Sequence, residues 1–244
     1  MVRVSAPFVP ALLVACHLAR GHRLLDVGTG TGLVAAAAAD HDARVIALDV
    51  SPAMLARARD RVAWLGVHLV AGNAEALPCR DGSFDAAACH FALVFLDRPD
   101  AALAELHRVL RPGGRVALTA LARPEATAYG LVFEALGQHA SRPRDVLRRL
   151  CSLGRPDRLG ELLVNAGFRE VRVERVEREV RWASFAEYWS VIDAGAGLAG
   201  QEYRALPRAA RRTVREAVEQ RMAARGDAQG LAWEIEALLA TGRR

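Results

Sequence analysis

The sequence of 244 residues contains no lysine, and all 33 of its basic residues are arginine. Aromatic residues make up only 6% of it. A nucleic-acid-binding protein would concentrate basic residues in one patch with aromatic residues between the charges. Here the arginines gather in two helical patterns with apolar opposite faces, so we interpret them as solvated helix faces and expect no nucleic-acid partner. The two groups are Arg142, Arg144, Arg148 and Arg149, and Arg208, Arg211, Arg212 and Arg215.

Long apolar runs are also absent. No run reaches the roughly 18 residues that a membrane-spanning helix needs, so we expect no membrane partner. The apolar N-terminal stretch is broken by Pro7 and Pro10 and leads straight into the first predicted core strand. This pattern favours a helix of the mature protein over a signal peptide.

Cysteine is scarce as well. Cys16, Cys79, Cys89 and Cys151 lie far apart, and none belongs to a CxxC pair or a Cys/His cluster with the spacing of metal ligands. We therefore expect no structural metal and no disulfide framework, and the cytoplasm is the predicted location.

Residues 23–121 alternate between short apolar runs and helical patterns. The runs "RLLDV", "RVIALDV", "VHLVAG" and "GRVALTAL" predict strands, and "SFDAAACHFALVFL" contains another. Helices are predicted at 32–40, at 51–66 after the N-cap Ser51, and at 97–111, ended by Pro112 and Gly113. This alternation predicts an α/β fold with a mostly parallel sheet and helices on both faces.

Beyond Arg123 the rhythm changes. Helical patterns return at 122–156 and 183–229, a further helix is predicted at 155–168, and 169–179 has the alternating polarity of a strand. The pattern of 231–241 fits a helix or a strand. We predict a single domain, 1–244, with a cofactor-binding half at 1–121 and helical insertions at 122–156 and 183–229.

The stretch "LLDVGTGTGL" places Gly28, Gly30 and Gly32 directly after the first strand. That position lies at the carboxyl edge of the sheet, where open α/β sheets bind ligands. Asp49 ends the second strand, and a carboxylate there can accept both hydroxyls of a ribose. The glycine loop and Asp49 together indicate a cofactor that contains adenosine. Leu33 stands where a dinucleotide site has its third glycine, which disfavours NAD and FAD.

Several stretches together resemble the class I S-adenosylmethionine (SAM) methyltransferases, namely "LLDVGTGTG", "ALDVSPAML", "GNAEALPCRDGSFDAAACHFALVFLDRPDAALAELHRVLRPGGRVAL" and "LGELLVNAGFREVRVE". The nearest group is similar to the methyltransferases of ubiquinone and menaquinone biosynthesis. The resemblance implies a Rossmann-like seven-stranded sheet whose last strand, at 233–241, is antiparallel and follows strand six at 169–177. It also implies SAM as the cofactor and S-adenosylhomocysteine as its product.

Site roles follow from the same resemblance. The glycines pack against the methionine part of SAM with Asp26 near its amino group, Asp49 holds the ribose, and Val50 and Met54 flank the adenine. Asn73 replaces the usual aspartate at the adenine amine, where its amide oxygen still accepts one bond. Phe8 borders the cofactor. The implied cofactor set is Asp26, Gly28, Thr29, Gly30, Gly32, Asp49, Val50, Met54, Asn73, Ala74, Glu75 and Cys89.

His90 is the candidate catalytic residue, because it follows strand four at the same sheet edge and its ordinary pKa suits proton removal near neutral pH. A contact with the SAM amino group or with the pocket wall is the alternative role. The acceptor pocket is expected from the insertions, where aromatic residues are concentrated. Alternatively, these aromatic residues form the core that joins the insertions to the sheet. The candidate acceptor-binding residues are Tyr129, Phe133, His139, Trp182 and Tyr188.

The predicted activity is methyl transfer from SAM to a small, partly apolar metabolite, with oxygen slightly favoured over nitrogen or carbon. Three alternatives stay open: a SAM-binding protein of the same fold with another catalytic or scaffold role, a nicotinamide oxidoreductase, and an RNA methyltransferase. The last would need a basic groove, which the sequence does not indicate. The oligomeric state is left open, with a homodimer among the alternatives.

Overall fold

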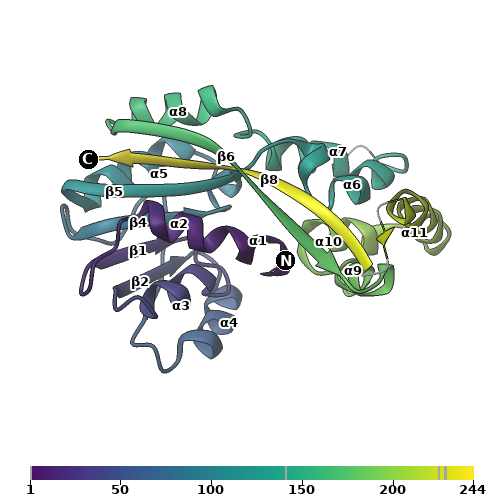
Figure 1. Ribbon diagram of the computed structural model, residues 1–244, viewed down its shortest axis with the longest axis horizontal. Coiled ribbons are helices and arrows are strands. Elements are labelled where there is room, and N and C mark those ends of the chain that lie inside the picture. The colour runs from purple at the N-terminus through teal and green to yellow at the C-terminus, as the bar shows by residue number, and fades with distance from the viewer. Residues whose placement is uncertain (1, 141, 225, 228–229) are drawn as a thin grey trace. The chain divides into compact units, whose positions relative to one another are not determined.

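The computed structural model describes residues 2–140, 142–224, 226–227 and 230–244. Its sheet follows the order β3-β2-β1-β4-β5-β8-β6, and β7 pairs with β8 off this path (Figure 1). The strands are β1 (Arg23–Val27), β2 (Arg44–Asp49), β3 (His68–Ala71), β4 (Phe84–His90), β5 (Leu110–Leu121), β6 (Arg169–Trp182), β7 (Gly226–Asp227) and β8 (Gly230–Arg243).

The strands from β3 to β5 pair in parallel. The last strand, β8, is antiparallel to its neighbours β5 and β6, and Arg244 at its end exchanges backbone hydrogen bonds with Gly113 and Gly114. The predicted Rossmann-like sheet with an antiparallel last strand is therefore confirmed. The pattern of 231–241, which fits a helix or a strand, belongs to a strand because it pairs between two neighbours.

Eleven helices are assigned in the described part of the chain. They are α1 (Val2–Ser5), α2 (Val9–Ala15), α3 (Leu33–Ala39), α4 (Pro52–Val62), α5 (Pro99–Val109), α6 (Gly130–Leu136), α7 (Arg142–Leu150), α8 (Pro156–Asn165), α9 (Phe185–Asp193), α10 (Gly197–Ala205) and α11 (Arg208–Ala223), with short 3-10 turns η1 (Ala6–Phe8), η2 (Leu93–Phe95) and η3 (Pro124–Ala126). Helix α3 packs against both α2 and α4, and α5 packs against α8. The central strands β1 and β4 are almost wholly buried, as expected for parallel strands covered on both faces.

A local signal explains the start of α4, whereas strand pairing explains the start of β5. Helix α4 starts where predicted, with the Ser51 hydroxyl accepting a hydrogen bond from the Met54 N–H at 3.4 Å and Pro52 in the first turn. Strand β5 begins at Leu110, earlier than predicted from "GRVALTAL", because Leu110 pairs with Phe84 before a register shift. The helix before it accordingly ends at Val109.

The chain divides into two compact units. The sheet unit comprises residues 8–120, 153–176 and 237–244, and the helical unit comprises 1–7, 121–152 and 177–236. The predicted insertions contribute α6, α7 and α9 to α11 to the helical unit. The interpretation of 1–244 as a single domain stays a prediction.

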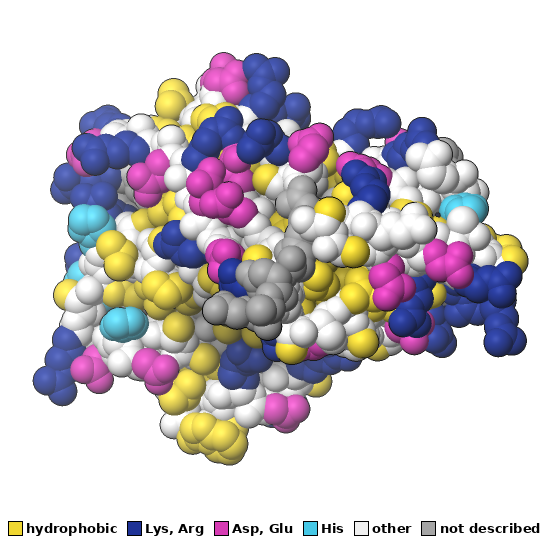
Figure 2. All heavy atoms as spheres, turned by 45° about the vertical axis from the view of Figure 1, so that its right-hand side comes forward, with side chains coloured by type: hydrophobic (Ala, Val, Ile, Leu, Met, Phe, Trp, Pro, Cys, Tyr) yellow, Lys and Arg dark blue, Asp and Glu magenta, His cyan; other side chains and the backbone are white. Residues whose placement is uncertain are grey.

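The surface carries charges of both signs. On the face drawn in Figure 2, basic and acidic side chains are interspersed over most of the area, with apolar side chains between them. Within the described part of the chain, every helix is too short or too polar to cross a bilayer.

Candidate functional site

The glycine loop after β1 has three glycines with different surroundings. All three have a positive φ, from 56° to 76°, which glycine adopts without strain. A Cβ on Gly28 would lie 2.3 Å from the Ala92 Cβ, and one on Gly32 would lie 3.2 Å from Ala58 in α4. A Cβ on Gly30 would meet nothing closer than 4.0 Å. Gly28 and Gly32 therefore permit packing within the protein, whereas Gly30 leaves room for a ligand to approach the backbone.

Asp49, at the end of β2, is bonded to this loop. One carboxylate oxygen accepts a hydrogen bond from the Gly30 N–H at 2.8 Å, and the other accepts one from the Ser51 N–H at 2.8 Å. The loop is also tied to β2 by the Thr29 N–H, which donates to the Leu48 carbonyl at 3.0 Å. Each carboxylate oxygen has a second lone pair, so Asp49 can hold the loop and still accept a ribose hydroxyl.

Asp26, at the end of β1, is fully buried. One carboxylate oxygen accepts a hydrogen bond from the Thr29 hydroxyl at 2.6 Å, but Oδ1 accepts none of ordinary geometry from any described residue. Burial raises the pKa of Asp26 to about 6, and the charge of Asp49 adds to the increase. Hydrogen bonding to the Thr29 hydroxyl and the Ala35 N–H lowers the pKa and so offsets part of this increase. An unpartnered buried carboxylate oxygen is costly. It fits a cationic group such as the ammonium of SAM.

The side chains predicted to flank the adenine are exposed and apolar, since Val50 is 73% and Met54 39% exposed. The loop after β3 uses its polar side chains internally. The Asn73 amide oxygen accepts a hydrogen bond from the Glu75 N–H at 2.9 Å. Glu75 in turn accepts from the N–H groups of Asp97 and Arg98, both at 3.0 Å, and so caps the start of α5. The sequence did not predict this capping role for Glu75.

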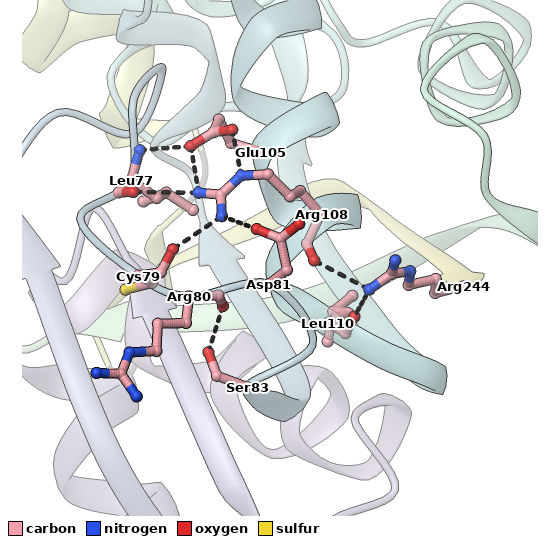
Figure 3. A network of polar contacts seen from close by, with 9 residues as sticks. All are labelled: Leu77, Cys79, Arg80, Asp81, Ser83, Glu105, Arg108, Leu110 and Arg244. Carbon is pink, nitrogen blue, oxygen red and sulfur yellow. Dashed lines mark hydrogen bonds and ion pairs between the residues drawn. The ribbon is translucent and has the colours of Figure 1, made fainter.

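Helix α5 fixes the next part of that loop through Arg108 (Figure 3). The Arg108 guanidinium binds both carboxylate oxygens of Glu105 at 2.7 Å, donates to the carbonyls of Leu77 and Cys79, and reaches Asp81 at 2.6 Å. Glu105 also accepts from the Leu77 N–H at 2.7 Å. Hydrogen bonding to Arg108 lowers the pKa of Glu105.

Sequence reasoning missed this pair. The available signal was weak, namely two opposite charges three residues apart on a helix. The network holds residues 77–81, which continue directly from the proposed adenine loop, and the Arg108 carbonyl accepts from the Arg244 side chain at 2.9 Å.

His90 ends β4, and its ring has a fixed neighbour. Nδ1 lies 2.7 Å from the Thr119 hydroxyl, which orients the imidazole. Phe91 follows with φ of 53°, a costly conformation for a bulky residue. Its ring packs on His90 at 4.5 Å and edge-on against Phe8 at 5.6 Å. Such strain is typical of functional sites, and nothing in the sequence indicated it.

Cys89 contributes packing rather than reactivity. It is buried, and burial raises the pKa of its thiol to about 12. A thiol that stays protonated at neutral pH is a poor nucleophile.

The candidate acceptor residues lie in the helical unit, where three of them meet. Tyr188 stacks on Tyr129 at 5.7 Å and meets Trp182 edge-on at 5.1 Å. All three are buried, and the Tyr188 hydroxyl donates to the Ala128 carbonyl at 2.8 Å. This geometry is that of a packed aromatic core. Phe133 instead lines a separate pocket, and His139 is exposed after α6.

Comparison with known proteins confirms the predicted resemblance. Residues 25–118 match the family described as a methyltransferase domain. The chain is 42% identical over 123 residues to the ubiquinone/menaquinone biosynthesis C-methyltransferase UbiE of Methylobacterium nodulans, an alignment that covers 48% of each sequence. The chain thus spans about half the length of the curated relatives it matches.

Solved structures share the fold over nearly the whole chain. Phosphoethanolamine N-methyltransferase 2 of Haemonchus contortus, solved with S-adenosylhomocysteine, has a TM-score of 0.60 at 18% identity and covers 98% of this chain and 52% of its own. The cyclase SpnF has a TM-score of 0.62 at 21% identity and covers 98% of this chain and 81% of its own. The chain has the Rossmann-like fold of class I methyltransferases.

Proposed function

We propose that this protein is a SAM-dependent methyltransferase that acts on a small, partly apolar metabolite. The observation that carries the proposal is the edge formed by β1 and β2. There a glycine loop with room above Gly30 lies between the unpartnered oxygen of Asp26 and the carboxylate of Asp49. The matches to methyltransferases over residues 25–118 support the same activity and the same cofactor.

The residues of this edge would share the work of binding. Asp26 would pair with the cofactor's ammonium, Asp49 would accept the ribose hydroxyls, and Val50 and Met54 would cover the adenine. SAM supplies an electrophilic methyl group on its sulfonium when bound. The protein's part in the transfer is then to hold the acceptor in line with that group and to exclude water.

His90 would act as the general base, with its ring held by Thr119. Removing a proton matters for a hydroxyl or an acidic carbon, because either becomes nucleophilic only as the proton leaves. The sequence slightly favours an oxygen acceptor, whereas UbiE is named as a C-methyltransferase. Incubation with methyl-labelled SAM and a panel of phenols and quinols, followed by NMR of the product, would assign the methylated atom.

The alternative is a SAM-binding protein that catalyses another reaction. The similarity to the cyclase SpnF favours keeping it, because that protein shares the fold. Tight SAM binding without labelled product across the panel would support this alternative. The location in the cytoplasm and the oligomeric state stay predictions.

The cofactor assignment has a direct test. Asp49→Ala should weaken SAM binding by about 1–3 kcal/mol, because a charged hydrogen-bond partner is lost. Isothermal titration calorimetry with SAM and S-adenosylhomocysteine measures this, and the exposed Asp60→Ala on α4 is the control. An unchanged affinity in Asp49→Ala would refute the ribose assignment.

A further inference from the structure

A cavity lies within the helical unit, formed by η3, α6, α7 and α11. Its volume is about 620 Å³, within the range of small-molecule sites. Apolar side chains supply much of its lining. They are the buried Phe133 and Leu147, together with Pro124, Ala135 and Ala217. The cavity therefore suits the apolar body of a small molecule.

The charged residues of this lining are unbalanced, with Arg144, Arg148 and Arg221 against Glu134 alone. Arg221 pairs with Glu134 at 2.6 Å, so these two charges offset each other. Arg148 pairs at 3.2 Å with Asp145, one turn away on the same exposed helix surface. Arg144 has no hydrogen bond or ion pair with any described residue. The cavity thus has an apolar lining and a guanidinium that no carboxylate neutralises.

Gly137 makes room for this guanidinium. A Cβ on Gly137 would lie 2.5 Å from the Arg144 Cγ and 2.6 Å from its Nε. The backbone of Gly137, with φ of −65°, is one that any residue adopts. The backbone conformation therefore does not require glycine at position 137. The absence of a side chain instead allows Arg144 to pass close to the backbone beside the cavity.

From these features we propose that the cavity binds a small molecule with an apolar body and one anionic group, whose anion lies against Arg144. A guanidinium is well suited to carboxylate, sulfonate or phosphate groups because it donates several hydrogen bonds in a planar fork. This site is separate from the cofactor assignment, and direct binding tests it without any methyl transfer.

The probe is 8-anilinonaphthalene-1-sulfonate, an apolar fluorophore with one sulfonate, titrated into the full chain with saturating S-adenosylhomocysteine. Uncharged N-phenyl-1-naphthylamine has the same ring framework without the anion and serves as the matched probe. Arg144→Gln should weaken binding of the sulfonate about tenfold, as expected for one charge-assisted hydrogen bond. Binding of the uncharged probe should change little.

Gly137→Ala keeps the charge but displaces the Arg144 side chain, so it should weaken sulfonate binding without lowering the thermal stability. Arg212→Gln removes an exposed arginine of α11 outside the cavity and is the control. The proposal is overturned if Arg144→Gln leaves the sulfonate affinity unchanged, or if Arg212→Gln lowers it equally. A loss of both probes alike in Arg144→Gln, with the fold intact by circular dichroism, would also overturn it.

Discussion

At the scale of single residues, the proposed cofactor site depends on two carboxylates that lie near the ends of neighbouring strands but differ in environment. Asp49 has a backbone donor on each oxygen, whereas Asp26 has one oxygen without a partner. The sequence predicted Asp49 as a ribose contact from its position at the end of β2. The resemblance to class I methyltransferases implied that Asp26 lies near the amino group of SAM. It could not predict which one would be electrostatically unsatisfied, because that depends on burial and on the Thr29 hydroxyl.

If Asp26 pairs with the ammonium of SAM, as proposed, cofactor binding should depend on pH. Its pKa is raised to about 6 in the absence of SAM, and only the ionised carboxylate pairs with an ammonium. SAM affinity should therefore rise as the pH increases through about 6, with release of a proton on binding. Calorimetry in buffers of different ionisation enthalpy measures that proton. Asp26→Asn should bind more weakly and lose this pH dependence; wild-type affinity that stays flat between pH 5 and 7 would contradict the pairing.

In the absence of cofactor, Asp26 has the opposite effect on the pH dependence of stability: the free energy of unfolding falls as the pH rises. A pKa raised on folding means that the folded protein binds the proton more tightly than the unfolded chain does. The contribution of Asp26 to the free energy of unfolding is fully present below the pKa that it has in the unfolded chain, about 4. It is lost as the pH rises through about 6. This loss amounts to about 3 kcal/mol. Urea unfolding as a function of pH measures it, and Asp26→Asn, which has no carboxyl group to titrate, is the reference that should lack this pH dependence.

His90 is the residue whose role kinetics can decide. His90→Ala should lower kcat by about 10²-fold or more if the imidazole removes the acceptor proton, with little change in SAM affinity. Thr119→Val removes the partner of Nδ1 and should cost less, because the ring remains. Single-turnover rates measure both, and a His90→Ala variant with the wild-type kcat would exclude proton removal by this residue.

At the scale of elements, α5 positions the loop that follows β3. Glu75 caps its start, and the Arg108 network holds residues 77–81 to its last turn. The sequence predicted the helix but not this function, because the partners lie between 22 and 31 residues apart along the chain. A pattern within one element carries no information about such contacts.

Arg108→Lys tests the network. Lysine keeps the charge but cannot bind both oxygens of Glu105 and reach two loop carbonyls at once. The variant should lose about 1–3 kcal/mol of unfolding free energy and bind SAM more weakly. Arg80→Lys is the control, since Figure 3 shows that side chain directed away from the network. Denaturant unfolding and calorimetry measure the two effects, and a SAM affinity equal to that of Arg80→Lys would limit Arg108 to a structural role.

At the scale of the whole molecule, the chain consists of a sheet unit with the proposed cofactor site and a helical unit with its own cavity. The aromatic residues predicted to bind the acceptor divide between two environments. Tyr129, Trp182 and Tyr188 form a buried core, and Phe133 faces the cavity. Composition located the aromatic-rich segments, but it could not separate core from pocket, since both favour the same side chains.

The sequence by itself determined the strand and helix order, the glycine loop and the acids at the strand ends. These signals are local, because apolar periodicity and turn residues act within a few positions of one another. Tertiary structure alone decided which glycine leaves room for a ligand, which carboxylate oxygen lacks a partner, and where Arg108 and Arg144 point. Each of these depends on packing between segments distant in the chain, which no local pattern encodes.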